Sequence, residues 1–190
     1  KKMGAKNITL VDRKGVLNKN RKDLNKYNQD LAVDTKSNTL DQCIIEADVF
    51  IGVSGANLLK ESHLLSMAAN PIIFALANPD PEILPSDAHQ IRDDIVMATG
   101  RSDFPNQVNN VLGFPFLFRG ALDAKATEIT DKMLIAASKA LASLTKEPVP
   151  QDVLEAYGLK SLTFGPEYII PKPFDSRLID WVAKAVQNAA

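Results

Sequence analysis

The stretch from Ile72 to Pro115 decides the fold: it reads IIFALANPDPEI at 72–83 and IVMATGRSDFPNQVNNVLGFP at 95–115. Each half begins with a short apolar run and continues into a polar, turn-forming cluster. This pattern is typical of buried parallel strands whose working side chains lie just past their carboxyl ends. Four amide side chains fall within residues 106–110, which is more than a turn needs. We therefore expect a polar, uncharged ligand to be held there.

The alternation of strands and helices continues on both sides of this stretch. Apolar runs predict further strands at 7–12 and 48–53, and helical segments lie between the predicted strands. Alternating strands and helices are typical of an α/β fold with a parallel sheet and right-handed crossovers. After residue 110 the chain becomes helical. The dense apolar run at 111–122 is expected to be buried against the sheet or another domain.

Polar residues follow each predicted strand and are the candidate ligand contacts. Asp12 ends the first run, and an acid in this place can bond a ribose hydroxyl, although it can equally be a simple turn residue. Ser54 begins a loop that either approaches a ligand or only connects two elements. Asn78 precedes two prolines that stiffen its turn, and its amide either faces a ligand or satisfies local backbone groups.

One expected part of a dinucleotide-binding fold is missing from the sequence. Such a fold has a first strand followed by G-x-G-x-x-G and the start of a helix, and no such motif occurs here. Residues 1–6 fit the end of that helix. We therefore expect a Rossmann-like α/β sheet with flanking helices that lacks its first strand and phosphate loop, both of which would lie upstream.

Length, charge and cysteine content narrow the class of protein. The 190 residues are enough for one domain with a sizeable core, and a net charge of -1 gives no reason to expect nucleic acid as a partner. No apolar run approaches the ~20 residues of a membrane span. The single Cys43 cannot form an internal disulfide, which fits a reducing compartment. We expect a cytoplasmic protein.

Four blocks of sequence together resemble one enzyme family. They are DRKGV at 12–16, FALANPDPEI at 74–83, ATGRSDFPNQVNNVLGFPFLFRGALD at 98–123 and FGPEYIIPKPFDSRL at 164–178. They resemble the carboxyl-terminal half of bacterial malic enzymes, and the resemblance covers essentially all 190 residues. It implies one NAD(P)-binding domain over 1–190, with carboxyl-terminal helices from about residue 124 to 190.

The resemblance also implies a reaction and a set of site residues. Malic enzymes oxidatively decarboxylate L-malate to pyruvate and carbon dioxide, with NAD or NADP as hydride acceptor and Mg²⁺ or Mn²⁺ as Lewis acid. By the matching motifs, Asp12, Ser54 and Asn78 are assigned to the cofactor, and Asn78 and Asn110 to the substrate. A neutral amide can hold a carboxylate without competing with the metal. The expected ligand thus becomes an anionic hydroxy acid beside the nicotinamide.

The resemblance leaves the family's catalytic tyrosine and lysine and its acidic metal ligands unmatched, because their motifs lie upstream. We therefore expect no catalytic residue and no metal ligand in this chain, and no activity from the chain alone. Cofactor choice stays open: Asp12 favours NAD, whereas Arg13 and Lys14 can neutralise the 2′-phosphate of NADP. The missing amino-terminal half is the expected partner, in a homo-oligomer.

Two other functions remain open from the sequence. A non-catalytic nucleotide-binding or assembly module would also lack the phosphate loop and the catalytic residues. Another α/β dehydrogenase that acts on a different hydroxy acid would share the sheet but not the NPDPE block at 78–82 or the PNQVNN block at 105–110.

Overall fold

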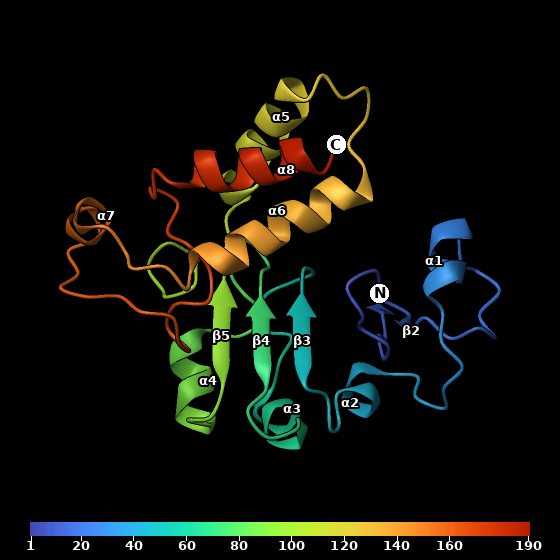
Figure 1. Ribbon diagram of the computed structural model, residues 1–190. Helices are drawn as coiled ribbons and strands as arrows, with labels where there is room; N and C mark the ends of the chain where they lie inside the picture. Colours follow the sequence, from blue (N-terminus) through green and yellow to red (C-terminus); the bar gives the residue numbers. More distant parts are fainter.

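A computed structural model describes residues 1–190 and is centred on a three-stranded parallel sheet (Figure 1). Its order is β3 (Val49–Gly52), β4 (Ile72–Ala75) and β5 (Val96–Thr99). The three strands are in register, because Gly52 lies opposite Ala75 and Ala75 lies opposite Thr99. The predicted α/β fold with a parallel sheet and flanking helices is confirmed, and the three carboxyl ends lie side by side.

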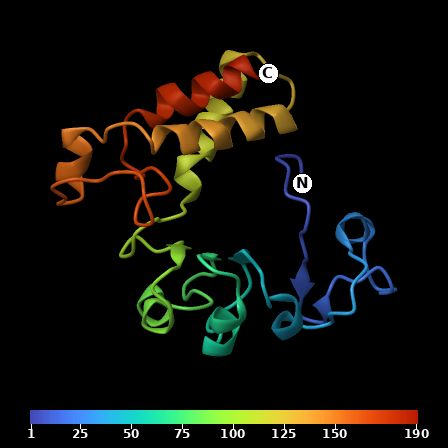
Figure 2. The ribbon, with the colours of Figure 1, turned by 60° about the horizontal axis from the view of Figure 1, so that its bottom comes forward.

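The two faces of this sheet differ in their cover. Side chains alternate along a strand, and one set packs with α3 (Glu61–Ser66) and α4 (Pro85–Ile91) into an apolar core that includes Ile73, Ala75 and Met97. Figure 2 shows α3 and α4 on the same side of the sheet. The opposite set on β3 is bare: Val49 and Ile51 are 47% and 62% exposed, and Val53 just beyond the strand is 77% exposed. This face of the sheet therefore lacks a covering layer at β3 within this chain, whereas Ala98 of β5 on the same face is fully buried.

A layer of helices lies beyond the carboxyl ends of the strands (Figures 1 and 2). It consists of α5 (Phe114–Asp123), α6 (Asp131–Leu144), the π-helical turn η2 (Ile179–Ala183) and α8 (Lys184–Asn188). These elements share a second apolar core, to which α6 contributes four buried residues at helical spacing: Met133, Ala137, Ala140 and Leu144. The expectation that the run at 111–122 is buried is wrong in part, because one side of α5 faces solvent with Phe114, Phe118 and Leu122.

Close packing of α5 on the carboxyl-terminal helices depends on Gly120. A Cβ atom at this position would lie 2.4 Å from the Ala183 carbonyl oxygen and 2.7 Å from the Val186 Cβ. Backbone and a buried β-branched side chain cannot move aside easily. The sequence FRGALD therefore places its glycine where two helices meet.

We expect Gly120→Ala to lower the free energy of unfolding by about 2 kcal/mol, since overpacking outweighs the better helix propensity of alanine. The matched control is Gly113→Ala, because a Cβ at Gly113 meets nothing within 4 Å. Urea unfolding of both variants checks the prediction. Equal midpoints for the two variants would contradict it.

The amino-terminal segment does not form the strand that its apolar run predicts. Only Val11–Asp12 (β1) is extended, and it pairs antiparallel with Gly15–Val16 (β2) in a small hairpin. The predicted buried parallel strand at 7–12 is therefore wrong. The physical reason is that no strand of the parallel sheet pairs with it, so its backbone groups pair only within the hairpin.

Shorter elements complete the chain. They are α1 (Lys26–Leu31), α2 (Leu40–Cys43), the 3₁₀ turn η1 (Asn110–Leu112) and α7 (Gln151–Ala156). None of the helices combines the length and apolar character that crossing a bilayer requires.

Candidate functional site

The candidate site is the carboxyl end of the sheet, where three loops meet. They are residues 53–57 after β3, 76–82 after β4 and 100–110 after β5. Because the strands are parallel and in register, these loops leave the sheet at one level. The helices of the second core lie beyond them (Figure 1). Loops that are positioned by a rigid sheet are the usual place for ligand-binding side chains.

A buried carboxylate, Glu82, ties two of these loops together. Its side chain is 0% exposed, and its Oε1 and Oε2 accept hydrogen bonds from the backbone N–H groups of Ser54 (3.0 Å) and Ala77 (3.1 Å). Backbone bonds from Leu59 to the Glu82 carbonyl oxygen and from Asn57 to that of Pro81 reinforce the link. Glu82 thus holds the β3 and β4 loops at a fixed separation.

The feature of the sequence that could have revealed the role of Glu82 is Gly52, at the end of β3. A Cβ atom at Gly52 would lie 2.3 Å from the Glu82 Cδ, so only glycine leaves room for this carboxylate at the end of β3. The sequence alone predicts no role for Glu82, because an acid after two prolines is typical of an exposed turn.

Asn78, in the loop after β4, lies against the loop after β5. Its amide lies over Gly100, where a Cβ would be 3.2 Å from both Nδ2 and Oδ1. The residue is exposed, and its only hydrogen bond within the chain is a 3.4 Å contact from Nδ2 to the Leu76 carbonyl oxygen. Most of the hydrogen-bonding capacity of this amide is therefore free for a ligand.

The cluster of four amides at 106–110 divides into structural and free members. Asn106 is buried, its Nδ2 donates to the carbonyl oxygens of Met97 (2.8 Å) and Pro166 (2.6 Å), and its Oδ1 accepts from the Ile169 N–H (2.9 Å). It therefore links β5 to the carboxyl-terminal segment. The expectation that all four amides hold a ligand is wrong for Asn106, whose groups are all used inside the protein.

The other three amides differ from one another. Gln107 donates to the Gly100 carbonyl oxygen at 3.4 Å, and Asn109 accepts from the Val111 N–H and so caps the turn η1. Asn110 is exposed and makes no side-chain hydrogen bond within the chain. Asn110 is thus the member of the cluster that is available to a ligand, and its neighbours hold its loop in place.

The two arginines near the site are paired with acids. Arg101 makes a bidentate pair with Asp103 and lies over the ring of Phe104. Arg119, whose side chain is 55% exposed, pairs with Asp123 one helical turn along α5.

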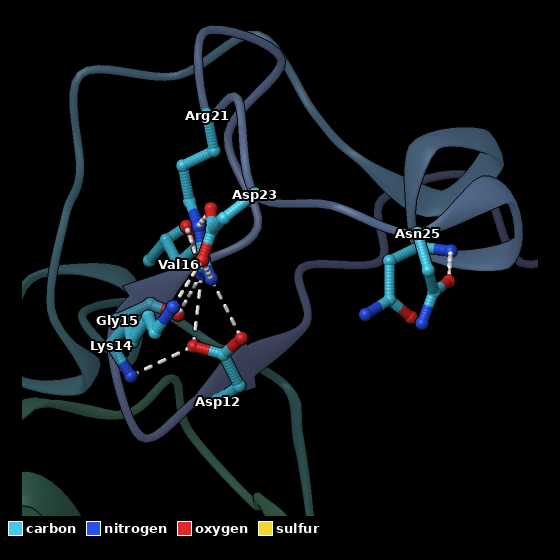
Figure 3. Close-up of polar contacts among 8 residues, drawn as sticks. Asp12, Lys14, Gly15, Val16, Arg21, Asp23 and Asn25 are labelled. Carbon is cyan, nitrogen blue, oxygen red and sulfur yellow. Dashed lines mark hydrogen bonds and ion pairs between the residues drawn. The ribbon is translucent and has the colours of Figure 1, made fainter.

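Asp12 lies at the hairpin and belongs to a charged cluster, which we call the Arg21 cluster: Asp12, Lys14, Arg21 and Asp23 (Figure 3). The Arg21 guanidinium donates to Asp12 Oδ1 (2.9 Å) and Oδ2 (2.8 Å) and, through Nε and Nη2, to Asp23 (3.0 Å each). The Lys14 N–H donates to Asp12 Oδ1, and Lys14 Nζ donates to Asp23.

These contacts explain the electrostatics of the cluster. Hydrogen bonds from Arg21 lower the pKa of Asp12 below its usual value, and hydrogen bonds from Arg21 and Lys14 lower that of Asp23. The same two carboxylates raise the pKa of Arg21. All these charges are therefore present at neutral pH. Asp12 keeps little free accepting capacity, because Oδ1 already accepts two hydrogen bonds and Oδ2 accepts one.

Residues for a metal ion are not grouped in this chain. No set of three or more His, Cys, Asp or Glu side chains lies in an arrangement that could hold one. Glu82 has no neighbouring acid in its contacts and both its oxygens are bound to backbone N–H groups. The residues present do not fit a metal site.

A parallel sheet with polar loops at its carboxyl end is typical of the class of nucleotide-binding α/β domains. The family described as "Malic enzyme, NAD binding domain" matches residues 1–155. The chain belongs to the malic enzyme family.

Similar proteins agree with this assignment. The chain is 55% identical, over 98% of its length, to the NADP-dependent malic enzyme of Halomonas elongata, and 55% identical, over 97%, to that of Rhizobium meliloti. The structure of the NAD-dependent malic enzyme of Thermotoga maritima is 39% identical and covers the whole chain with a TM-score of 0.83. The chain spans 44% of the Halomonas protein, 24% of the Rhizobium protein and 47% of the Thermotoga chain.

Proposed function

We propose that this chain is the NAD(P)-binding part of an enzyme that oxidatively decarboxylates L-malate to pyruvate and carbon dioxide. The observation that carries the proposal is the pair of free amides, on Asn78 and Asn110, in two loops at the carboxyl end of one parallel sheet. Similar proteins are named NADP-dependent or NAD-dependent malic enzymes. NAD or NADP would accept the hydride.

Each proposed site residue has a task that its contacts allow. Asn78 and Asn110 would donate to a malate carboxylate and orient the substrate against the nicotinamide, because neutral amides add no competing charge. Ser54, whose backbone is fixed by Glu82, would approach the cofactor from the β3 loop. Asp12 would lie near the adenosine ribose.

The catalytic acid and base and the ligands for Mg²⁺ or Mn²⁺ are proposed to lie in the rest of the full-length protein. We also propose one domain over 1–190, since Asn106 joins the sheet to the carboxyl-terminal segment. A homo-oligomer in the cytoplasm completes the proposal, and the lone Cys43 fits a reducing compartment.

The bare side of β3 supports a complementary half. Val49, Ile51 and Val53 are exposed, and no strand pairs with the outer side of β3. An apolar strand at the side of a sheet normally has a partner or a cover. We propose that a strand and helix from the rest of the protein cover it and bring the phosphate-binding loop to the site.

The test is malate-dependent reduction of NAD and NADP in the presence of Mn²⁺. We expect turnover from the full-length protein and none from the 190-residue chain alone, because the chain holds neither the metal ligands nor the acid and base. Turnover by the chain alone would contradict the proposal that the metal ligands and the catalytic acid and base lie in the rest of the protein. Cofactor binding without malate turnover by the full-length protein would instead favour a non-catalytic nucleotide-binding module.

A further inference from the structure

We propose that Arg21 is a positioning residue that sets the cofactor preference toward NADP by neutralising Asp12. The inference rests on the proposed function, because it assumes that the hairpin meets the adenosine ribose. It names a residue that decides between NAD and NADP. The sequence leaves that choice open, because Asp12 favours NAD whereas Arg13 and Lys14 favour NADP.

The first step is the grip of Arg21 on Asp12. The guanidinium donates to both carboxylate oxygens, and its Nη1 also donates to the Gly15 carbonyl oxygen at 3.2 Å. A planar fork that meets a carboxylate with two parallel bonds is the strongest form of this pair. The Arg21 side chain is only 17% exposed, so the pair is partly shielded from water (Figure 3).

The second step concerns how many further hydrogen bonds Asp12 can accept. Its Oδ1 accepts two hydrogen bonds, from the Lys14 N–H and Arg21, while Oδ2 accepts one from Arg21. Selection of NAD by an acid depends on a carboxylate that accepts from the 2′-hydroxyl and repels a 2′-phosphate. Here the charge that would repel the phosphate is already paired with a guanidinium.

The third step is the charge around the hairpin. Within the Arg21 cluster, two acids balance two bases, and Arg13 adds an exposed positive charge with no ion pair. The Lys14 side chain is bound to the cluster only through Asp23, and it is 71% exposed. Lys14 and Arg13 can therefore turn toward a phosphate without leaving a buried charge unpaired. Together with Arg13, the Arg21 cluster has three basic and two acidic side chains, and without Arg21 the two signs would balance.

The test uses the full-length protein and equilibrium binding of NAD and NADP, together with kcat and KM for each. We expect Arg21→Met to weaken NADP binding about tenfold, because the unmasked Asp12 charge repels the 2′-phosphate, and to change NAD binding by less than about twofold. The double variant Asp12→Asn with Arg21→Met removes the unmasked charge. It is expected to recover most of the NADP affinity.

The matched control is Arg92→Met, which removes another bidentate arginine–aspartate pair, with Asp94, whose two side chains are 13% and 32% exposed. We expect it to leave the ratio of NAD to NADP affinity unchanged. Equal losses for both cofactors in Arg21→Met, no loss for either, or no recovery in the double variant would overturn the inference. If the unaltered protein binds neither cofactor, the proposed function fails instead.

Discussion

Glu82→Ala is expected to lower the free energy of unfolding of the full-length protein by about 3–4 kcal/mol. The change removes two charge-assisted hydrogen bonds. It leaves the N–H of the buried Ala77 without a partner, at a cost of about 1–3 kcal/mol, whereas the N–H of the exposed Ser54 can bond water instead. It also opens a cavity beside Gly52. Thermal and urea unfolding measure the loss.

Two further variants separate the buried carboxylate from a general loss of charge. Glu82→Gln keeps the shape and one acceptor but turns an amide N–H toward a backbone N–H, so we expect a smaller loss of about 1–2 kcal/mol. Glu128→Ala removes an exposed acid and is expected to change stability by less than about 0.5 kcal/mol. If Glu82→Ala and Glu128→Ala unfold at the same midpoint, Glu82 does not hold the two loops.

Asn110→Ala is expected to lower kcat/KM for malate about a hundredfold in the full-length protein, with cofactor affinity nearly unchanged. The size follows from losing a hydrogen-bond donor that orients the substrate at the reacting centre. Because Asn110 makes no side-chain hydrogen bond within the chain, its loss should not affect stability. Steady-state kinetics and a melting curve measure both quantities.

A second substitution at Asn110, which adds a negative charge, tests the same prediction. Asn110→Asp has the same shape but would repel a malate carboxylate, so we expect a larger loss than for alanine. Asn188→Ala, at the end of α8, is the control and should retain full activity. An Asn110→Ala enzyme with unchanged kcat/KM would exclude Asn110 from the substrate site.

The central strands could be predicted because local signals in the sequence mark where each strand begins and ends. The runs at 72–77 and 95–99 are short, apolar and followed by turn residues, and they form β4 and β5. The run at 7–12 has the same local character, yet it forms only the two-residue β1. A strand requires a neighbour, and the presence of a neighbour is not encoded in the run itself.

The site was predictable in part for a similar reason. Asn78 and Asn110 follow strands, and the structure leaves both amides free. Asn106 and Glu82 look equally suited to a ligand or a turn, but their partners are backbone groups up to 63 residues away in sequence. Only the three-dimensional arrangement shows that these two polar side chains hold loops, because burial of a polar group depends on distant segments.

The bare face of β3 has a consequence for how this chain behaves when it is separated from a covering layer. Unpaired backbone groups beside exposed Val49, Ile51 and Val53 form a template onto which another extended chain can add. A second copy of the chain can then bind β3 in place of the proposed covering strand, and the fraction bound in this way rises with protein concentration. The proposed cover of β3 would therefore protect the protein from aggregation as well as complete its sheet.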